Sequence, residues 1–361
     1  MDHLTDYAFD LPPSQIAQAP ADRRDQARLL VVDGEDLREA RFADVPALLP
    51  PGALVILNDA KVIPARLWAQ KPTGGQVELL AIEPANADSA ASATDHTWRC
   101  MARSSKPLRA GTELLLTHRG TPAAEPRIAV QVVSGRDPAA GTVVIAFPED
   151  PGAIMDRFGE LALPPYIHRD GRQNDADRDR YQTVYARVPG AIAAPTAGLH
   201  FTGALLDEIT ARGHDLARLT LHVGPGTFAP IRTESIADHV MHEERFDIPE
   251  ATATAIAAAH REGRPIVAVG TTCVRALESA ATAPGQVSPG PGQTRLFIRP
   301  GYPFQIVSHL ITNFHLPQST LLMLVSAFSG HPRIMAAYRH AVATGFRFFS
   351  YGDAMLLTRA P

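Results

Sequence analysis

Cysteine is scarce in this chain of 361 residues, because only Cys100 and Cys273 occur and they form no CxxC pair. This scarcity excludes a disulfide-rich scaffold and a cysteine-ligated zinc site, and it favours a reducing compartment. Long apolar runs are also missing: LLMLVSAF at 321–328 is too short to span a bilayer. The first residues lack the basic and apolar regions of a secretory signal. We therefore predict a cytoplasmic protein that does not bind membranes.

Several nucleotide-binding and catalytic motifs are absent as well. No GxGxxG follows an early strand, and neither GxxxxGK[ST] nor GxSxG occurs. These absences weigh against a dinucleotide-dependent dehydrogenase, a P-loop NTPase and an α/β hydrolase. The net charge of −4 and the pI near 6.4 exclude an overall basic nucleic-acid binder. They leave room for a local basic patch.

The apolar runs that are present predict an α/β domain. Runs at 29–32 and 53–57 read as buried strands, each ending in a polar loop. Helical patterns occur at 203–213 and 248–263, with Pro249 near the start of the second, and a further strand pattern follows at 264–270. Strands that alternate with helices in this way are typical of an α/β sheet.

Between residues 70 and 150 the pattern changes. Five short strand-like runs, QVELLAI, TWRCMA, TELLLT, RIAVQVV and TVVIAF, are separated by turn residues and carry no helical period. Such spacing favours a small barrel. We predict a discontinuous α/β domain with a mixed sheet, residues 1–69 and 151–361, that carries an inserted small β-barrel domain, residues 70–150.

Histidines occur in loops that follow apolar runs. APTAGLHFT at 194–202 is a tight turn that presents His200, and either a structural or a catalytic role fits it. His222 lies in LHVGPGTF, where Gly224 and Gly226 either let the backbone approach a ligand or simply make a turn.

A third histidine segment is HVMHEERFDI at 239–248. We expect His239 and His242 to share a helix face beside Glu243 and Glu244. This arrangement suits general acid–base chemistry, a divalent metal site or a merely solvated charged face. The spacing departs from HExxH and no third metal ligand is evident.

Two further segments have the chemistry of binding loops. Thr271 and Thr272 follow the strand that ends at Gly270, so they either form an anion site at a helix start or only cap that helix. Asn313, Phe314 and His315 precede an apolar helix capped by Ser319-Thr320, and a polar, aromatic loop suits purine recognition.

Two further features have both a functional and a purely structural explanation. Tyr351 and Asp353 flank Gly352 after an aromatic run at 346–349 that we expect to be a strand, and an ordinary β-turn also explains them. In the barrel region, four cations lie beside Trp98 with no acid between them, as either a phosphate patch or a solvated loop. These cations are Arg99, Arg103, Lys106 and Arg109.

Together these stretches resemble one family. The resemblance is carried by RDQARLLVVD, LNDAKVIPARL, LPPYI, RYQTVYA, AAPTAGLHFT, LHVGPGTFAPIR, HVMHEE, VGTTCVRALES, ITNFHLPQSTLLMLVSAF and FRFFSYGDAMLL. In order, from about residue 5 to 357, they are similar to the S-adenosylmethionine:tRNA ribosyltransferase-isomerases of queuosine biosynthesis. Ala60 departs from the threonine expected there, and Asp59, Lys61 and Arg66 remain in place.

The resemblance implies an enzyme that moves and isomerises the ribosyl part of S-adenosylmethionine. The acceptor is the 7-aminomethyl-7-deazaguanine base at the wobble position of tRNA, and the products are epoxyqueuosine-tRNA, adenine and methionine. It also implies an α/β domain with an inserted barrel and no metal or redox cofactor, since S-adenosylmethionine is consumed as a substrate. We expect a monomer whose partners are this tRNA and S-adenosylmethionine.

Residue chemistry then suggests tasks for the candidates. A base must take protons from the aminomethyl group and from the carbon next to the sulfonium, and an acid must protonate departing adenine. The acid–base candidates are His200, His222, His239, His242, Glu243 and His315, with Glu244 as an alternative partner to Glu243. The substrate-binding candidates are Thr271, Thr272 and Arg275 for the methionine carboxylate, Asn313 and Phe314 for a purine, and Tyr351 and Asp353. The candidates for tRNA phosphates are Lys61, Arg66, Arg99, Arg103 and Lys106.

Two other classes of protein remain open at this point. One is a metal-dependent hydrolase that uses His239, His242 and a further histidine. The other is an RNA-binding protein without catalytic activity.

Overall fold

The computed structural model describes residues 3–86, 96–119, 127–137, 141–169, 175–224, 236, 239 and 241–361. Gly226 lies outside the described residues. The chain forms two compact units. The first comprises 1–61, 180–188 and 194–361, and the second comprises 62–179 and 189–193.

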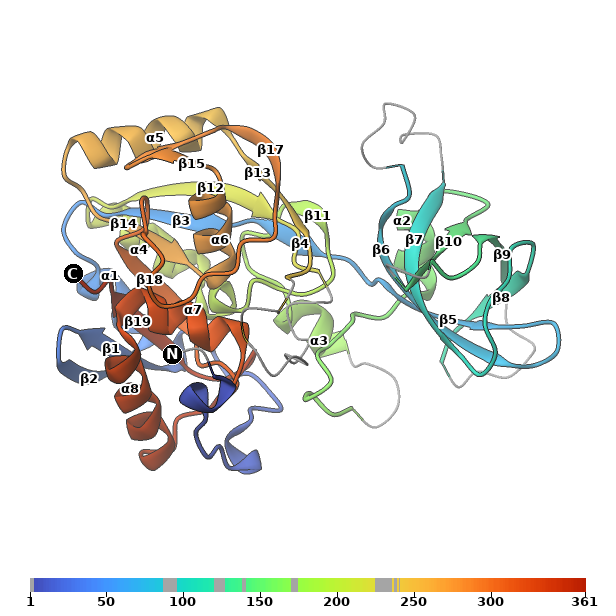
Figure 1. Ribbon diagram of the computed structural model, residues 1–361, viewed down its shortest axis with the longest axis horizontal. Helices are drawn as coiled ribbons and strands as arrows, with labels where there is room; N and C mark the ends of the chain where they lie inside the picture. Colours follow the sequence, from blue (N-terminus) through green and yellow to red (C-terminus); the bar gives the residue numbers. More distant parts are fainter. Residues whose placement is uncertain are drawn as a thin grey trace. The chain divides into compact units, whose positions relative to one another are not determined.

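The first unit is built on a mixed sheet. Within the described residues it has nine strands in the order β17-β13-β12-β3-β14-β18-β19-β1-β2 (Figure 1). Strands β12, β3, β14 and β18 are parallel, while β19 and β1 run antiparallel to β18. The strands are β1 (Arg28–Asp33), β2 (Asp36–Arg41), β3 (Leu54–Asn58), β12 (Asp215–Leu221), β13 (Glu244–Ile248), β14 (Ile266–Val269), β17 (Gly290–Thr294), β18 (His309–Asn313) and β19 (Ala354–Thr358). The mixed α/β sheet predicted from the sequence is confirmed.

Helices cover both faces of this sheet, which explains why every residue of the central strands β3 and β14 is buried. On one face, Leu205 and Ile209 of α4 join Phe42 and Val45 in a core with the strand residues. Helices α5 to α8 also contact the sheet strands. The helices are α1 (Val45–Leu48), α4 (Gly203–Ala211), α5 (Glu250–Arg261), α6 (Thr271–Ser279), α7 (Thr320–Ser329) and α8 (His331–Ala343). The predicted cap of α7 is present, because Ser319 Oγ accepts a hydrogen bond from Leu322 N at 3.2 Å.

The parallel strands bring the polar loops to one edge. Strands β3, β12, β14 and β18 end at Asn58, Leu221, Val269 and Asn313. The antiparallel strands β13 and β19 start at the same edge, since Phe246 pairs with Leu221 and Ala354 pairs with Asn313. The carboxyl edge of a parallel sheet is the usual position of a ligand site in α/β folds. We refer to it as the carboxyl edge.

The second unit contains a closed antiparallel barrel. Its described strands run β10-β7-β6-β5-β8-β9, around an apolar interior that includes Leu67, Leu79, Leu116 and Val132. The strands are β5 (Arg66–Gln70), β6 (Gln76–Pro84), β7 (Thr97–Ser104), β8 (Glu113–Thr117), β9 (Ile128–Ser134) and β10 (Thr142–Ala146). The five predicted strands are confirmed as β6 to β10, and β5 is an additional strand that alternates between buried and half-buried residues.

The compact units extend beyond the predicted domain limits, because the barrel unit also holds β5 and residues 147–179. Helix α2 (Pro151–Phe158) packs Ile154, Met155 and Phe158 against the barrel core. The domain boundaries at 70 and 150 stay a prediction. The remaining elements are α3 (Asp175–Arg180), β4 (Ala60–Val62), β11 (Val188–Ala191), β15 (Ala281–Ala283), β16 (Gln286–Val287), η1 (Leu4–Tyr7), η2 (Pro13–Gln15), η3 (Arg24–Gln26), η4 (Phe42–Asp44) and η6 (Thr196–His200).

Two local predictions are wrong. Residues 239 and 241–243 are not helical, and β13 begins at Glu244, because the alternating residues 244, 246 and 248 are buried in the sheet. The aromatic run at 346–349 is not a strand either. Apart from an isolated bridge between Phe348 and Ile16, its rings are buried in the core, where Phe346 and Phe348 pack against Phe314.

Candidate functional site

Asn58 holds the carboxyl edge together. Its side chain is fully buried, and its Oδ1 accepts hydrogen bonds from Leu221 N at 3.0 Å and Ala60 N at 3.1 Å. Its Nδ2 donates to Leu221 O at 3.0 Å and to Thr272 Oγ1 at 3.3 Å. One amide therefore ties the end of β3 to the end of β12 and to the first turn of α6.

An Asn58→Ala variant should lose about 2–3 kcal/mol of unfolding free energy, because it leaves the buried N–H and C=O of Leu221 without partners. Urea denaturation followed by circular dichroism measures this loss. Asn58→Asp keeps the two acceptor contacts but adds a second buried carboxylate beside Asp59, so it should be at least as destabilised as Asn58→Ala. Equal stability of all three proteins would contradict the linking role.

Asp59 forms a second buried polar group beside Asn58. Its Oδ1 accepts a hydrogen bond from Thr220 Oγ1 at 2.7 Å, and its Oδ2 accepts from Arg187 Nε at 3.0 Å. The carboxylate has no exposed surface, whereas the Arg187 side chain is 62% exposed. The pair thus places a fixed negative charge just inside the carboxyl edge, with its counter-charge at the surface.

Glu244 and Arg275 form a buried ion pair. Their side chains are only 3% and 4% exposed, and Arg275 Nη1 donates to Glu244 Oε2. Glu244 Oε1 also accepts from Gly224 N at 3.2 Å, which fixes the chain just after β12. Arg275 Nε donates to Leu296 O at 3.3 Å, but the buried Nη2 has no partner among the described residues. A buried guanidinium with a spare donor is suited to an anionic or carbonyl group of a ligand.

The N-terminus of α6 lies at the same edge. It begins after Gly270, whose φ of 91° and ψ of 150° belong to a region that only glycine adopts without strain. The first N–H groups of the helix, those of Thr271 and Thr272, have no partners within the helix. Both threonines are buried. An anion at this position is favoured by the N–H groups and by the helix dipole.

His222 follows β12 directly and is half-buried. Its main chain is fixed by a hydrogen bond from its N–H to Arg245 O at 2.9 Å. Burial and the positive charge of Arg245 lower the pKa of His222 below its usual value of 6.5, against the opposing effect of Asp59. The ring is therefore neutral at pH 7, and its buried Nδ1 has no partner among the described residues. A neutral imidazole with an uncommitted nitrogen can accept a proton.

His200 ends η6 and is more deeply buried. Asn313 Nδ2 donates to Phe349 O at 3.1 Å and lies 3.2 Å from His200 Nε2, which therefore acts as the acceptor. The ring packs on Phe42 with centroids 4.9 Å apart. Burial lowers the pKa of His200 to about 4, so the ring stays neutral near pH 7. The Oδ1 of Asn313 is buried without a partner among the described residues.

His315 and Phe314 point into the core of the first unit. His315 Nε2 lies 3.0 Å from Thr312 Oγ1, and burial lowers the pKa of the ring to about 3. Phe314 has no exposed surface and packs on Phe348 with centroids 5.0 Å apart. A purine can stack on Phe314 only if this aromatic cluster opens.

Tyr351 and Asp353 lie on the turn before β19, and this turn is confirmed by a hydrogen bond from Gly352 N to Phe349 O at 2.9 Å. Asp353 Oδ1 accepts from Arg28 N at 2.9 Å, and Oδ2 accepts from Arg347 N at 2.8 Å. Asp353 therefore holds the start of β1 to this turn. Tyr351 is 2% exposed and lines a pocket.

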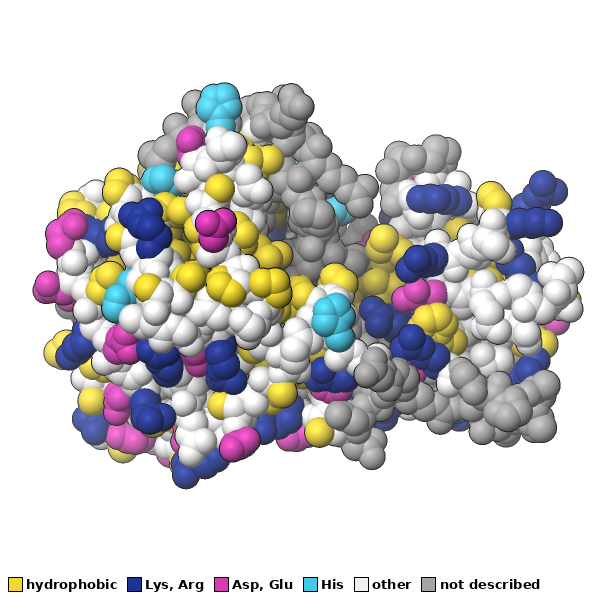
Figure 2. Space-filling model, turned by 90° about the horizontal axis from the view of Figure 1, so that it is seen from below, with side chains coloured by type: hydrophobic (Ala, Val, Ile, Leu, Met, Phe, Trp, Pro, Cys, Tyr) yellow, Lys and Arg dark blue, Asp and Glu magenta, His cyan; other side chains and the backbone are white. Residues whose placement is uncertain are grey.

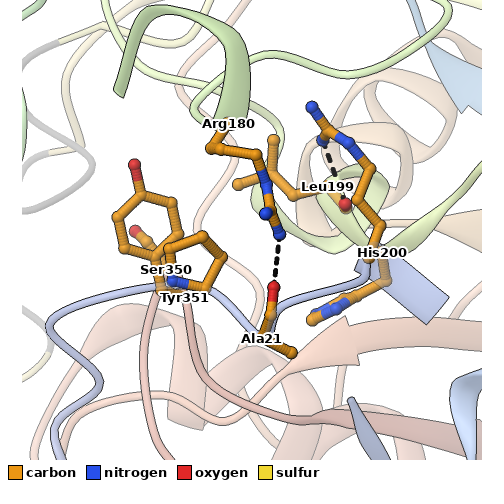
Figure 3. Close-up of a pocket in the computed structure, with 8 residues that line it drawn as sticks. Ala21, Arg180, Leu199, His200, Ser350 and Tyr351 are labelled. Carbon is orange, nitrogen blue, oxygen red and sulfur yellow. Dashed lines mark hydrogen bonds between the residues drawn. The ribbon is translucent and has the colours of Figure 1, made fainter. Parts of the chain in front are cut away.

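This pocket lies within the first unit, and its cavity of about 10 Å³ has room for about one water molecule (Figure 3). Figure 3 shows Arg180 and His200 on facing sides of it, with Tyr351 and Ser350 beside them. The residues that line it come from the loop before η3, the end of α3, the end of η6 and the turn before β19. They are Pro20, Ala21, Arg24, Arg180, Leu199, His200, Ser350 and Tyr351.

In the segment 239–248, Glu244 and Arg245 contact the carboxyl edge, whereas the two histidines lie apart from those contacts. The His239 ring lies edge-on to Phe297 with centroids 5.6 Å apart, and burial together with the charge of His242 lowers its pKa. His242 is exposed, and Glu243 forms an exposed ion pair with Arg295 at 3.0 Å. No group of three or more His, Cys, Asp or Glu side chains in the described ranges is arranged to hold a metal ion.

The predicted tRNA-binding cations belong to both units. Lys61 is exposed on β4 of the first unit. On the barrel, Arg66 pairs with Glu78 at 3.2 Å and Arg99 with Glu83 at 3.5 Å. Arg103 and Lys106 are exposed, as is Arg109. Figure 2 shows Lys and Arg side chains over the visible face of the barrel, interspersed with hydrophobic ones.

Several polar residues of the site were not among the predicted ones. Asn58, Thr220 and Arg187 form contacts at the carboxyl edge, and Arg24 and Arg180 line the pocket. Asn58 could have been found, because it directly follows an apolar strand. The two arginines lie in segments without an apolar pattern, so only the fold reveals their proximity.

The fold and the site define a protein with a mixed α/β sheet, a closed barrel and a polar carboxyl edge. A family model described as queuosine biosynthesis protein matches residues 4–357. The chain is 51% identical to the S-adenosylmethionine:tRNA ribosyltransferase-isomerase of Dechloromonas aromatica (strain RCB), covering 99% of this chain and 97% of that protein. It is 50% identical to the protein of the same name from Azoarcus sp. (strain BH72), with the same coverage.

A solved structure is similar as well. The crystal structure of S-adenosylmethionine tRNA ribosyltransferase from Thermotoga maritima is 33% identical, with a TM-score of 0.53 over 97% of this chain and 99% of that one. The chain therefore belongs to the queuosine biosynthesis protein family. No helix in the described part of the chain is long and apolar enough to cross a membrane.

Proposed function

We propose that this chain transfers the ribosyl part of S-adenosylmethionine to tRNA and isomerises it. This is the activity that the names of its relatives state. The observation that carries this proposal is 50–51% identity over essentially the whole of each chain. The fold agrees, since a solved ribosyltransferase covers both units. At the finer level, the acceptor is 7-aminomethyl-7-deazaguanine at the wobble position, and the products are epoxyqueuosine-tRNA, adenine and methionine.

Within this reaction we assign the proton-accepting role to His222. It is the histidine at the carboxyl edge that combines partial exposure, a lowered pKa and an uncommitted ring nitrogen. His200 and His315 are more deeply buried, and their hydrogen bonds to Asn313 and Thr312 support a positioning role. His239, His242 and Glu243 remain candidates for the proton donor.

The anionic end of S-adenosylmethionine fits the start of α6. Its carboxylate would accept hydrogen bonds from the N–H groups of Thr271 and Thr272 and from the spare Nη2 of Arg275. Glu244 keeps Arg275 in place. Asn313 Oδ1 is available to an amino group of a purine. We assign Tyr351 a contact with substrate from the pocket that it lines, whereas Asp353 acts by holding the turn that carries Tyr351. Lys61, Arg66, Arg99, Arg103 and Lys106 are proposed to contact tRNA phosphates.

Incubation with S-adenosylmethionine and tRNA that carries the precursor base should release adenine. Chromatography of the supernatant measures the adenine, and mass spectrometry of the tRNA nucleosides measures the product. Guanine-bearing tRNA is the control and should yield none. Absence of adenine with tRNA on which a relative is active would refute the enzymatic function and leave RNA binding alone.

We further propose that a monomer in the cytoplasm catalyses the reaction without a metal or redox cofactor. Exhaustive chelation should leave the rate of adenine release within about twofold of the rate of the untreated enzyme. An assay that needs no metal ion checks separately that the tRNA stays intact. Loss of activity that is restored by one particular divalent ion would instead support a metal-dependent enzyme. Light scattering of the active protein tests the monomer.

A further inference from the structure

Arg187 presents a guanidinium that is fixed on one side and open on the other. Its Nε and Nη2 both lie 3.0 Å from Asp59 Oδ2, and Asp59 is fully buried. Thr220 Oγ1 donates to the other oxygen of this carboxylate at 2.7 Å, so β12 holds the carboxylate in turn. The Arg187 side chain is nevertheless 62% exposed, and among the described residues its Nη1 has no hydrogen-bond partner. The buried carboxylate therefore sets the orientation of a guanidinium whose outer donors face solvent.

Lys61 brings a second cation to the same place. Arg187 N donates to Asp59 O at 2.7 Å, so both cations lie beside the main chain of Asp59. Lys61 follows Asp59 by two residues, and alternate side chains of an extended chain leave on the same side. Lys61 is exposed and forms no ion pair with any described residue. One carboxylate thus faces two cations, and the net charge of this group is positive.

The two cations lie close to the proposed proton acceptor, His222. The hydrogen bond from His222 N to Arg245 O continues the pairing of β12 with β13, so His222 extends the strand that carries Thr220. Residues two apart in a strand share a face, which places the His222 ring on the same face as the Thr220 hydroxyl that contacts Asp59. Burial lowers the pKa of His222, and the charge of Asp59 opposes this effect, as expected of neighbouring groups. A ligand group held by Arg187 would therefore lie beside the reacting group.

A phosphate of a nucleic-acid backbone is the ligand that fits these cations. A guanidinium binds phosphate through paired N–H donors, and a lysine adds a point charge. Exposed cations suit a group that belongs to a large polyanion, because such a group needs no enclosing cavity. Contacts to phosphates fix the register of a nucleic acid on a protein. A phosphate held here would set the position of the base that is presented to His222.

We propose that Arg187, in the orientation set by Asp59, and Lys61 bind a phosphate that flanks the wobble nucleotide of the tRNA. This inference rests on the proposed function for the identity of the RNA and of the reacting nucleotide. It adds Arg187 to the cations inferred from the sequence and assigns Lys61 to one particular region of the tRNA.

The test compares Arg187→Gln with the wild type in binding to full tRNA and to an anticodon stem-loop RNA. Filter binding without S-adenosylmethionine measures both dissociation constants. Loss of a charge-assisted contact should weaken both complexes about tenfold and reduce the salt slope by about 1. Arg187→Lys keeps the charge without the paired donors and should recover part of the affinity. Weakening of the full tRNA complex alone would overturn the proposal, because the contact would then lie outside the anticodon stem-loop.

Arg212→Gln is the matched control, because Arg212 is also an exposed arginine with one carboxylate partner, Glu208 on α4. It should change neither dissociation constant. The affinity of Arg187→Gln for S-adenosylmethionine, measured by equilibrium dialysis, should stay within about twofold of the wild type, since its carboxylate is assigned to the start of α6. Unchanged RNA affinity in a folded Arg187→Gln protein, as judged from its melting curve, would overturn the proposal.

Arg187→Gln leaves Asp59 without its counter-charge, and two further measurements cover the case in which this variant does not fold. In the first, a methylphosphonate replaces in turn each phosphate that flanks the wobble nucleotide, which removes the charge there. One of these replacements should weaken the wild-type complex about tenfold, and equal affinity for all of these RNAs would overturn the proposal. In the second, Lys61→Gln should weaken the complex with the unmodified stem-loop, but the complex with the sensitive methylphosphonate RNA much less. Equal weakening of the two complexes would contradict the assignment of Lys61 to this phosphate.

The proposed function can fail separately from this inference. Stem-loop binding that depends on Arg187 and on a flanking phosphate, without any adenine release, would refute the enzymatic function and leave the phosphate contact standing. Normal adenine release by an Arg187→Gln protein with unchanged RNA affinity would do the reverse.

Discussion

A Glu244→Gln variant should lose about 3 kcal/mol of unfolding free energy or more. The substitution keeps the shape of the side chain but removes its charge, so Arg275 remains as a buried cation without a counter-ion. Removal of one partner from a buried ion pair typically costs about 3–5 kcal/mol, because the remaining charge still bears its desolvation penalty. Both side chains are 4% exposed or less, so solvent screens the pair very little. Denaturation in guanidinium chloride measures the loss.

The neighbouring Glu243 supplies the control for this result. It forms an ion pair with Arg295, but the two side chains are 39% and 65% exposed. Glu243→Gln should therefore change the unfolding free energy by less than about 1 kcal/mol. The double variant Glu244→Leu/Arg275→Met should be more stable than Glu244→Gln, because it leaves no buried charge. A Glu244→Gln protein as stable as the Glu243→Gln protein would contradict the buried-pair interpretation.

The sheet and the barrel were predictable because burial imposes a period on the sequence. The run at 53–57 is apolar throughout since β3 is covered on both faces. The barrel strands alternate between apolar and polar residues because their outer face is exposed to solvent. Strand β5 was missed because Arg66 and Gln70 are half-buried and made its segment look like a loop. The helix expected over 239–248 failed for a related reason. The spacing of three between His239 and His242 does not by itself specify a helix, and from Glu244 onward the pairing of β13 with β12 and β17 decides the conformation.

The convergence of the loops was also predictable, since parallel strands end at one edge. Which side chains form contacts at this edge was not predictable. Asn58 contacts Thr272 across 214 positions, and Glu244 contacts Arg275 across 31, so only the completed topology defines these partners. The sequence also does not indicate how deeply each side chain is buried. Phe314 looked available for stacking, yet it is enclosed by other rings, whereas His222 has the partial exposure that proton transfer requires.

The pH dependence of turnover should separate His222 from its buried neighbours. Its pKa lies below 6.5, so the acid limb of kcat/KM for the wild type should also lie below pH 6.5. Stability falls in the same range, because His200 and His315 have folded-state pKa values of about 4 and about 3. Above pH 6.5 these two rings are neutral in both states. Below it the unfolded chain binds more protons than the native one, so the unfolding free energy decreases. Circular dichroism at each pH distinguishes unfolding from loss of the base.

A His222→Ala variant should reduce kcat by about 10²–10⁴-fold, the usual contribution of a positioned general base. Its affinity for S-adenosylmethionine should change little, because the anionic end is assigned to the start of α6. Single-turnover adenine release measures the effect, and a small imidazole added to the assay should restore part of the rate if the missing group transfers a proton. His260→Ala serves as the control, since His260 is exposed in the last turn of α5 and is not among the proposed site residues. Near-normal turnover in His222→Ala would move the base to another histidine. Near-normal turnover in the alanine variants of residues 200, 222, 239, 242 and 315 alike would exclude histidine as the base, because the reaction would then proceed with no imidazole from any of these loops.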